Sequence, residues 1–204
     1  MKNMGYTREQ VEAAVKAKGY VYFEDANNKS YDVNIIGIRN STTGQKVTNV
    51  FDDLLTVSYK DETGAWKYHE WPATTDPGKK GVMEYHNAAG VARLVEGQYR
   101  GSHGIGLHQG KYKALKQAKP VKVYRDPNRD LTYDETKIAE GIFGINIHRS
   151  SATGTSTYVE NWSEGCQVFS TVTDFDKFMA LCEKASAIHG NSFTYTLIES
   201  VDLV

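Results

Sequence analysis

The chain is poor in cysteine and has no long apolar run. Only Cys166 and Cys182 occur among its 204 residues, so at most one disulfide is possible. No stretch approaches the roughly eighteen apolar residues of a transmembrane helix, and residues 1–6 lack the apolar segment of a signal peptide. We therefore expect no membrane span, and either a cytoplasmic protein or one delivered outside the cytoplasm by a route other than a leader.

A surplus of basic charge is also missing. The chain has 24 Lys and Arg against 25 Asp and Glu, which argues against a nucleic-acid partner. Internal repeats, low-complexity tracts and heptads are absent, and the length suits one domain with a small appendage. Aromatic residues are plentiful, with thirteen Tyr, seven Phe and three Trp, as is typical of strands and of grooves that bind polar ligands.

The hydrophobic patterns predict a strand-dominated α+β fold. Strand patterns are found at residues 51–59, 66–71, 91–95, 121–125, 141–147 and 193–198. The glycine-rich residues 97–110 are expected to be irregular, and residues 111–119 and 134–140 to form short helical segments. The longest helix is predicted at Asp174–His189, with Thr173 as N-cap and Gly190 as terminator, and it would bury Cys182 against the sheet.

The first 45 residues are predicted to form a small helix-hairpin extension. Thr7 and Gln10 fit a capping box at the start of a short helix that Gly19 ends. Residues 20–24 and 31–39 have strand composition and are separated by a polar turn. The proposed division is therefore an extension at residues 1–45 and a main domain at residues 46–204.

One histidine and one cysteine occupy informative positions. His148 directly follows the apolar run of residues 141–147. Cys166 lies eighteen positions after His148 (166 − 148) and directly follows Gly165. A thiolate attacks an acyl carbon, and a neighbouring imidazole can take the thiol proton. Gly165 leaves room for a substrate carbonyl to reach backbone N–H groups that would stabilise an oxyanion.

This pattern resembles the signature of the L,D-transpeptidase (YkuD-type) family, in which a histidine is followed, after a loop, by Ser/Thr-His-Gly-Cys. Here fourteen residues separate His148 from Ser163-Glu164-Gly165-Cys166, and Glu164 stands where the family usually has a second histidine. The resemblance extends over residues 49–198. It implies a β-sandwich or barrel with one long helix after the cysteine strand, Cys166 as nucleophile, His148 as base, and Ser163 and Gly165 as supporting catalytic residues.

The resemblance also implies the substrate, which is the peptide stem of peptidoglycan cleaved between an L-centre and a D-residue. Hydrolysis, as by an L,D-carboxypeptidase or endopeptidase, and cross-linking by a transpeptidase both remain open, and the missing leader favours a hydrolytic, phage-lysin-like role. Five residues are predicted to contact the substrate, namely Arg149, Trp162, Glu164, His103 and His108. The main chain of Arg149 is also expected to orient His148. We expect a monomer without a cofactor.

Two other functions are compatible with these residues. Glu164 in place of the family histidine would suit a catalytically inactive module of the same fold that only binds cell-wall material. A metal hydrolase could be built on His86, His103 and His108, although their spacing matches no compact zinc motif, and we therefore predict no metal site.

Overall fold

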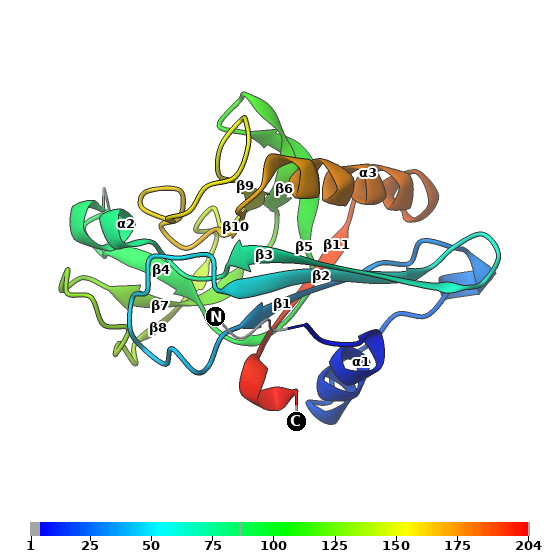
Figure 1. Ribbon diagram of the computed structural model, residues 1–204, viewed down its shortest axis with the longest axis horizontal. Coiled ribbons are helices and arrows are strands. Elements are labelled where there is room, and N and C mark those ends of the chain that lie inside the picture. The colour runs from blue at the N-terminus through cyan, green and yellow to red at the C-terminus, as the bar shows by residue number, and fades with distance from the viewer. Residues whose placement is uncertain (1–4, 86, 204) are drawn as a thin grey trace.

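Eight strands of the computed structural model close into a barrel within the residues that the structure describes, 5–85 and 87–203. Figure 1 shows how these strands and the helices are arranged. The order around the barrel is β1-β11-β5-β6-β9-β10-β3-β2. The strands are β1 (Asn34–Arg39), β2 (Asp53–Lys60), β3 (Trp66–Thr74), β5 (Gly97–His108), β6 (Tyr112–Gln117), β9 (Ile147–Arg149), β10 (Gln167–Phe169) and β11 (Phe193–Glu199).

A separate three-stranded sheet lies beside one end of the barrel (Figure 1). Its order is β4-β7-β8, and both pairs are antiparallel. The strands are β4 (Val91–Leu94), β7 (Val121–Asp126) and β8 (Ile138–Gly141). This small sheet approaches the predicted nucleophile, because the backbone N–H of Ala92 in β4 donates to the carbonyl oxygen of Glu164 over 3.0 Å.

Within the described residues, three α-helices and two short 3₁₀ segments complete the fold. They are α1 (Arg8–Ala17), α2 (Lys79–Glu84), α3 (Val172–His189) and the 3₁₀ segments Ala26–Asn28 and Ser200–Asp202. None of the helices in the described residues is long and apolar enough to cross a bilayer, in agreement with the sequence.

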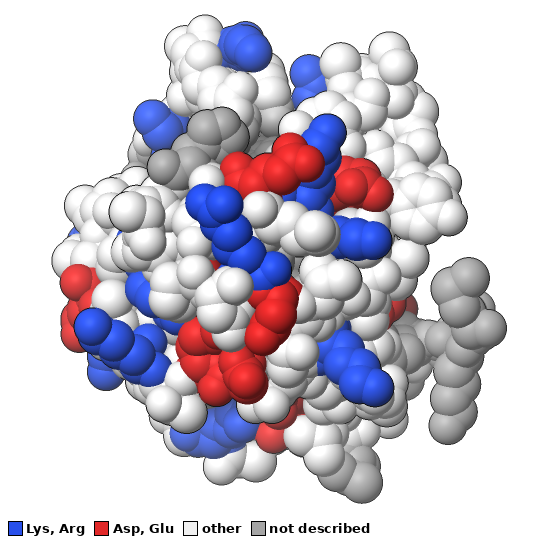
Figure 2. All heavy atoms as spheres, turned by 90° about the vertical axis from the view of Figure 1, so that its left-hand side faces the viewer, with Lys and Arg blue, Asp and Glu red and all other residues white. Residues whose placement is uncertain are grey.

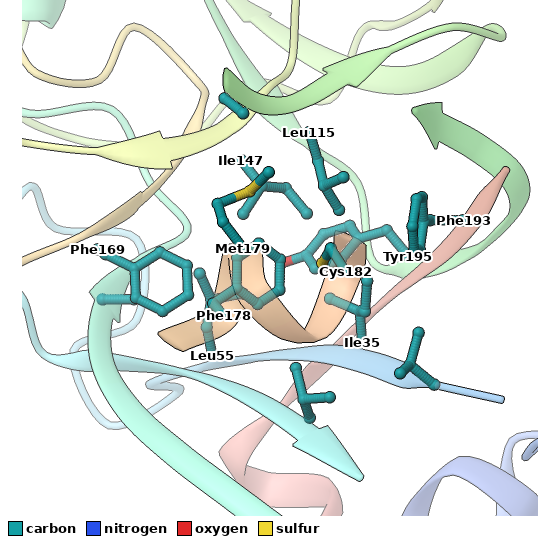
Figure 3. Close-up of a cluster of buried hydrophobic side chains, with 14 of the residues drawn as sticks. Ile35, Leu55, Leu115, Ile147, Phe169, Phe178, Met179, Cys182, Phe193 and Tyr195 are labelled. Carbon is teal, nitrogen blue, oxygen red and sulfur yellow. The ribbon is translucent and has the colours of Figure 1, made fainter. Parts of the chain in front are cut away.

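The main core lies between α3 and the barrel wall. One face of α3 buries Phe178, Met179 and Cys182 against apolar side chains from several strands, including Leu55 of β2 and Ile147 of β9 (Figure 3). Burial of such aliphatic and aromatic side chains contributes about 1.5–3 kcal/mol each. A second, smaller cluster packs α1 against the outside of β1 and β11.

Several sequence predictions are confirmed. The fold is α+β and strand-dominated, with one long helix after the cysteine strand. The capping box of Thr7 and Gln10 is present at the start of α1. Helix α3 buries the predicted face and ends at Gly190, although its N-cap is Thr171 and not Thr173.

The predicted N-terminal hairpin is wrong. Residues 20–24 form no strand, and the side chain of Asn34 substitutes for a partner strand by accepting from Phe23 N–H and donating to Phe23 O over 2.6 and 2.7 Å. Strand β1 instead pairs with β2 and in parallel with β11. The second half of the predicted extension therefore forms part of the barrel wall.

The glycine-rich segment and the short helix after it are one β-hairpin, contrary to prediction. Residues 97–108 form β5, in which Gly101 takes φ +59° where the pairing with β11 shifts register, as in a bulge that needs glycine. Gln109 and Gly110 both have positive φ, and Lys111 N–H donates to His108 O. His108 pairs with Tyr112, so residues 109–111 form a three-residue hairpin loop, and residues 112–117 continue as β6.

The two predictions for residues 134–147 are also wrong. The predicted helical turn at 134–140 is absent, and β8 begins at Ile138. The predicted strand at 141–147 is interrupted, because Gly144 takes φ +75° and Ile142 is 64% exposed. Residues 142–146 are instead a turn that leads into β9, and this turn forms part of the candidate site.

Candidate active site

Two short parallel strands bring the predicted nucleophile and base together. Val168 of β10 is in register with His148 of β9, and Gln167 with Ile147. Extending that register by one pair sets Cys166 opposite Asn146. Since side chains alternate along a strand, Cys166, Val168 and His148 share one face, and the thiol and imidazole are diagonal neighbours on it.

The turn that presents Cys166 depends on its two preceding small residues. The buried hydroxyl of Ser163 accepts from Gly165 N–H over 3.1 Å and donates to Cys166 O over 2.8 Å. Gly165 has φ +136°, and a Cβ there would collide with the carbonyl oxygen of Ala92. The supporting roles predicted for Ser163 and Gly165 therefore have a physical basis in the shape of this turn.

The sulfur lies against the turn of residues 142–146. The Cys166 thiol donates to Gly144 O over 3.3 Å. Gln117 of β6 holds this turn, since its Oε1 accepts from Phe143 N–H and Ile145 N–H over 3.0 and 2.9 Å. The backbone around the sulfur is thus fixed by hydrogen bonds rather than by strand pairing.

His148 has a defined tautomer. Its Nδ1 lies 2.7 Å from Arg149 O, and because a carbonyl oxygen only accepts, Nδ1 carries the proton. The hydroxyl of Tyr112 lies 3.4 Å from the same nitrogen. Nε2 of the neutral ring is therefore the basic nitrogen, and the main chain of Arg149 orients the ring as predicted.

A second imidazole stacks on the first. The rings of His108 and His148 are 4.1 Å apart at an interplanar angle of 22°. Burial, with a contribution from His108, lowers the pKa of His148 to about 3, because a charged ring is poorly solvated in this position. Burial and the charges of Lys116 and Lys111 also lower the pKa of His108.

The Cys166 thiol is neutral at rest. Burial, together with the Glu164 carboxylate, raises its pKa to about 11, although a backbone hydrogen bond from Asn146 acts in the opposite direction. With His148 also neutral at pH 7, no thiolate–imidazolium pair is formed in advance. Acyl transfer at this site therefore requires the proton to leave the thiol as the sulfur attacks.

The backbone N–H groups of Gly165 and Cys166 are the two groups that could form the expected oxyanion hole, and one of them is already occupied. Gly165 N–H is occupied by the Ser163 hydroxyl. The N–H of Cys166 has no acceptor among the described residues. It is consequently the group best able to donate to an oxygen of a bound substrate.

An open groove of about 770 Å³ passes the two catalytic candidates. Arg149, Trp162, Glu164 and His108 also line it, which brings four of the predicted substrate contacts together. Trp162 is 41% exposed and forms part of the wall, and the guanidinium of Arg149 lies 4.4 Å from the centre of the Tyr112 ring. Cations and aromatic surfaces of this kind suit a peptide that carries polar and anionic groups.

His103 does not line the groove, so the prediction that it contacts substrate is wrong. Its side chain is 1% exposed, with Nε2 2.8 Å from Ile145 O and Nδ1 2.8 Å from Ser102 Oγ. The carbonyl oxygen fixes the proton on Nε2. His103 therefore supports the turn of residues 142–146 from the side away from the groove.

The described residues provide no set of ligands for the alternative metal site. His86 lies outside the described residues, and within those residues no group of three or more His, Cys, Asp or Glu side chains is arranged to hold a metal ion. His103 and His108 are engaged in the different contacts described above.

Tyr112 and Gln117 belong to the site but were not predicted. Both lie on β6, for which the sequence predicts a short helical segment. That prediction does not place either residue near His148 or the turn of residues 142–146. The available signal was the pair Gln109-Gly110, whose composition suits a hairpin turn. The hairpin at this loop places Tyr112 directly opposite His108.

Comparison with family models, with curated proteins and with solved structures finds no match to this chain. The chemistry of the site and the motif around Cys166 are therefore the features that indicate a function.

Proposed function

We propose that this protein is a cysteine-dependent acyl-transfer enzyme that acts on the stem peptides of peptidoglycan. The chemistry is inferred from Cys166 and His148, which share one groove. The substrate is inferred from the resemblance of the segment from His148 to Cys166 to the L,D-transpeptidase signature. Hydrolysis, in the manner of a phage lysin, is the favoured outcome over cross-linking.

In the proposed reaction, Cys166 Sγ attacks the carbonyl carbon of an amide while the thiol proton moves to Nε2 of His148. The carbonyl oxygen of the tetrahedral intermediate accepts from Cys166 N–H. His148 then gives its proton to the leaving amine, the C–N bond breaks, and a thioester remains. Water or an amine attacks the thioester and gives a proton to His148, and the C–S bond breaks as His148 returns that proton to the sulfur.

The observation that supports this proposal most is the tautomer of His148. Its Nδ1–H is bound to Arg149 O, so the lone pair of Nε2 is the part of the ring available to a thiol on the same face of β9 and β10. A buried histidine with a purely structural role would more often use both nitrogens within the chain, as His103 does.

An inactive binding module of the same fold is the second candidate. It is favoured by the raised pKa of the thiol, to which Glu164 contributes. In that case the groove would still hold a stem peptide without forming a covalent bond to it.

A mass spectrum after incubation with a tetrapeptide stem separates the two candidates. We expect a thioester adduct on the peptide fragment that contains Cys166, absent from Cys166→Ala and retained in the matched control Cys182→Ala. Peptide binding without any adduct would favour the inactive module. Turnover by Cys166→Ala would refute the assignment of the nucleophile, and products consisting only of new cross-links would reverse the preference for hydrolysis.

A further inference from the structure

A second hollow begins on the other side of Glu164. It has a volume of about 430 Å³, and Glu164 lines both this hollow and the groove that contains Cys166. Its remaining wall comes from the small sheet, including Arg125 of β7, and from Ile142 and Phe143 of the turn against which the sulfur lies. A ligand in this hollow would therefore be a close neighbour of a carbonyl group that Cys166 attacks.

Arg125 is the cation that lines this hollow. One of its nitrogens donates to Gly90 O over 2.9 Å, and its guanidinium lies 4.7 Å from the centre of the Phe143 ring. No ion pair joins it to a carboxylate in the described part of the chain, whereas the more deeply buried Arg39 has both Asp76 and Glu96. The half-buried position of Arg125 lowers its pKa.

A half-buried guanidinium without a counterion is unusual, because loss of hydration costs free energy that a paired carboxylate normally offsets. The Arg125 side chain makes a single hydrogen bond, although a guanidinium has five N–H groups. The planar fork matches a carboxylate in a bidentate geometry. The ring of Phe143 already restricts the guanidinium plane, which reduces the entropy lost on binding.

The surroundings of Arg125 are consistent with a local anion site. On the face of the molecule drawn in Figure 2, which includes the end with the small sheet, basic and acidic residues are interspersed and do not form one broad basic patch. A carboxylate would consequently be recognised by a single cation and not by a general field. Because the negative Glu164 lines one side of the hollow, the ligand carboxylate has to lie toward Phe143.

We propose that this hollow is a carboxylate-binding subsite in which Arg125 holds a free carboxylate of the substrate close to the bond that Cys166 attacks. This inference rests on the proposed function. Ile142, which is 64% exposed on the rim, would pack against the aliphatic part of the same residue. The substrates are then peptides with a free carboxylate beside the scissile bond, supplied either by the C-terminus or by an acidic side chain.

Binding to the inactive variant Cys166→Ala tests the subsite without any turnover. Calorimetry would compare a stem peptide with the same peptide amidated at its C-terminus, and with one amidated only at its side-chain carboxyl. We expect one of the two amidated peptides to bind about tenfold to a hundredfold more weakly, the loss typical of a charged hydrogen-bonded pair. Weaker binding of the C-terminal amide would mean that the subsite holds the C-terminal carboxylate. Weaker binding of the side-chain amide would mean that it holds the side-chain carboxylate.

Adding Arg125→Gln should remove this preference, whereas adding Arg129→Gln should retain it. Arg129 is a matched control, since it lies over the ring of Tyr85 and does not line the hollow. Arg125→Lys keeps the charge and should keep part of the preference, which covers the case in which Arg125→Gln fails to fold.

Equal affinity for all three peptides would overturn the subsite, as would an Arg125→Gln variant that weakens the acid and the amide equally. The outcome is independent of thioester formation, because the nucleophile is absent. A clear carboxylate preference in a protein that never forms a thioester would refute the proposed function and leave the subsite standing.

Discussion

The two cysteines occupy regions of opposite character. Burial raises the thiol pKa at both positions, to about 11 at Cys166 and well above the ordinary value at Cys182. Cys182 lies on the inner face of α3, is 1% exposed, and packs in the main core. Cys166 lies beside backbone groups at the edge of a groove that also contains an imidazole. The two thiols are therefore not distinguished by their acidity. They are distinguished by their access to substrate and to a base.

Replacement of the proposed base, His148, should have the largest effect, because it removes the feature that distinguishes the surroundings of Cys166 from those of Cys182. His148→Gln is expected to slow thioester formation about 10²- to 10⁴-fold, the usual contribution of general acid–base catalysis, with little effect on peptide binding. Single-turnover kinetics would measure the acylation rate. His189→Gln is the matched control, because His189 lies at the end of α3 with its Nε2 2.8 Å from Ser30 O. Equal rates for wild type and His148→Gln would exclude His148 as the base.

The pH dependence of alkylation sharpens the comparison between the thiols. Since only the thiolate reacts, labelling of Cys166 by iodoacetamide should rise about tenfold per pH unit between about pH 7 and pH 10, below its pKa of about 11. Cys182 should stay unlabelled while the protein is folded. Peptide mass spectrometry after timed labelling would give both rates. A rate at Cys166 that is already constant near pH 7 would mean that the thiolate–imidazolium pair forms at rest.

The buried histidines around Cys166 should make the protein sensitive to acid. Burial lowers the pKa from its ordinary value of 6.5 to about 3 at His148 and to about 4 at His103. Below about pH 6.5 the unfolded chain binds protons that these two rings exclude in the folded chain, so their contribution to the free energy of unfolding falls as pH falls. The carboxyl groups of Asp53 and Glu135, whose pKa burial raises to about 7, contribute in the opposite direction. Each histidine contributes about 1.4 kcal/mol per pH unit, until the pH reaches its folded pKa.

Urea denaturation at pH 7, 6 and 5 would measure this loss. The difference between wild type and His103→Gln isolates one histidine, and it should change by the share of one histidine over this range. An identical pH dependence of the two proteins would contradict the assignment of a neutral, buried ring at His103.

The sequence was informative where chemistry or periodicity is local. The spacing of His148, Gly165 and Cys166 identified the pair that shares the groove, and the apolar stripe of α3 identified the core face. It was uninformative where a residue acts through a distant partner. Gln117 matters because its amide holds the turn of residues 142–146, and no local pattern marks such a contact. His103 was assigned to the groove because a histidine beside glycines looks like a loop residue, although β5 directs it inward.

Strand pairing in the barrel is least extensive next to the candidate site. Strands β6 and β9 are joined through the single residue pair Leu115 and Ile147, whereas β2 and β3 share eight pairs. Few ladder hydrogen bonds join β6 to β9, so bonds from Gln117 and Tyr112 of β6 to the turn of residues 142–146 and to Arg149 O supply most of the attachment between them. The position of the histidine-bearing strand in the cylinder is thereby set by two side chains of its neighbour more than by the strand ladder.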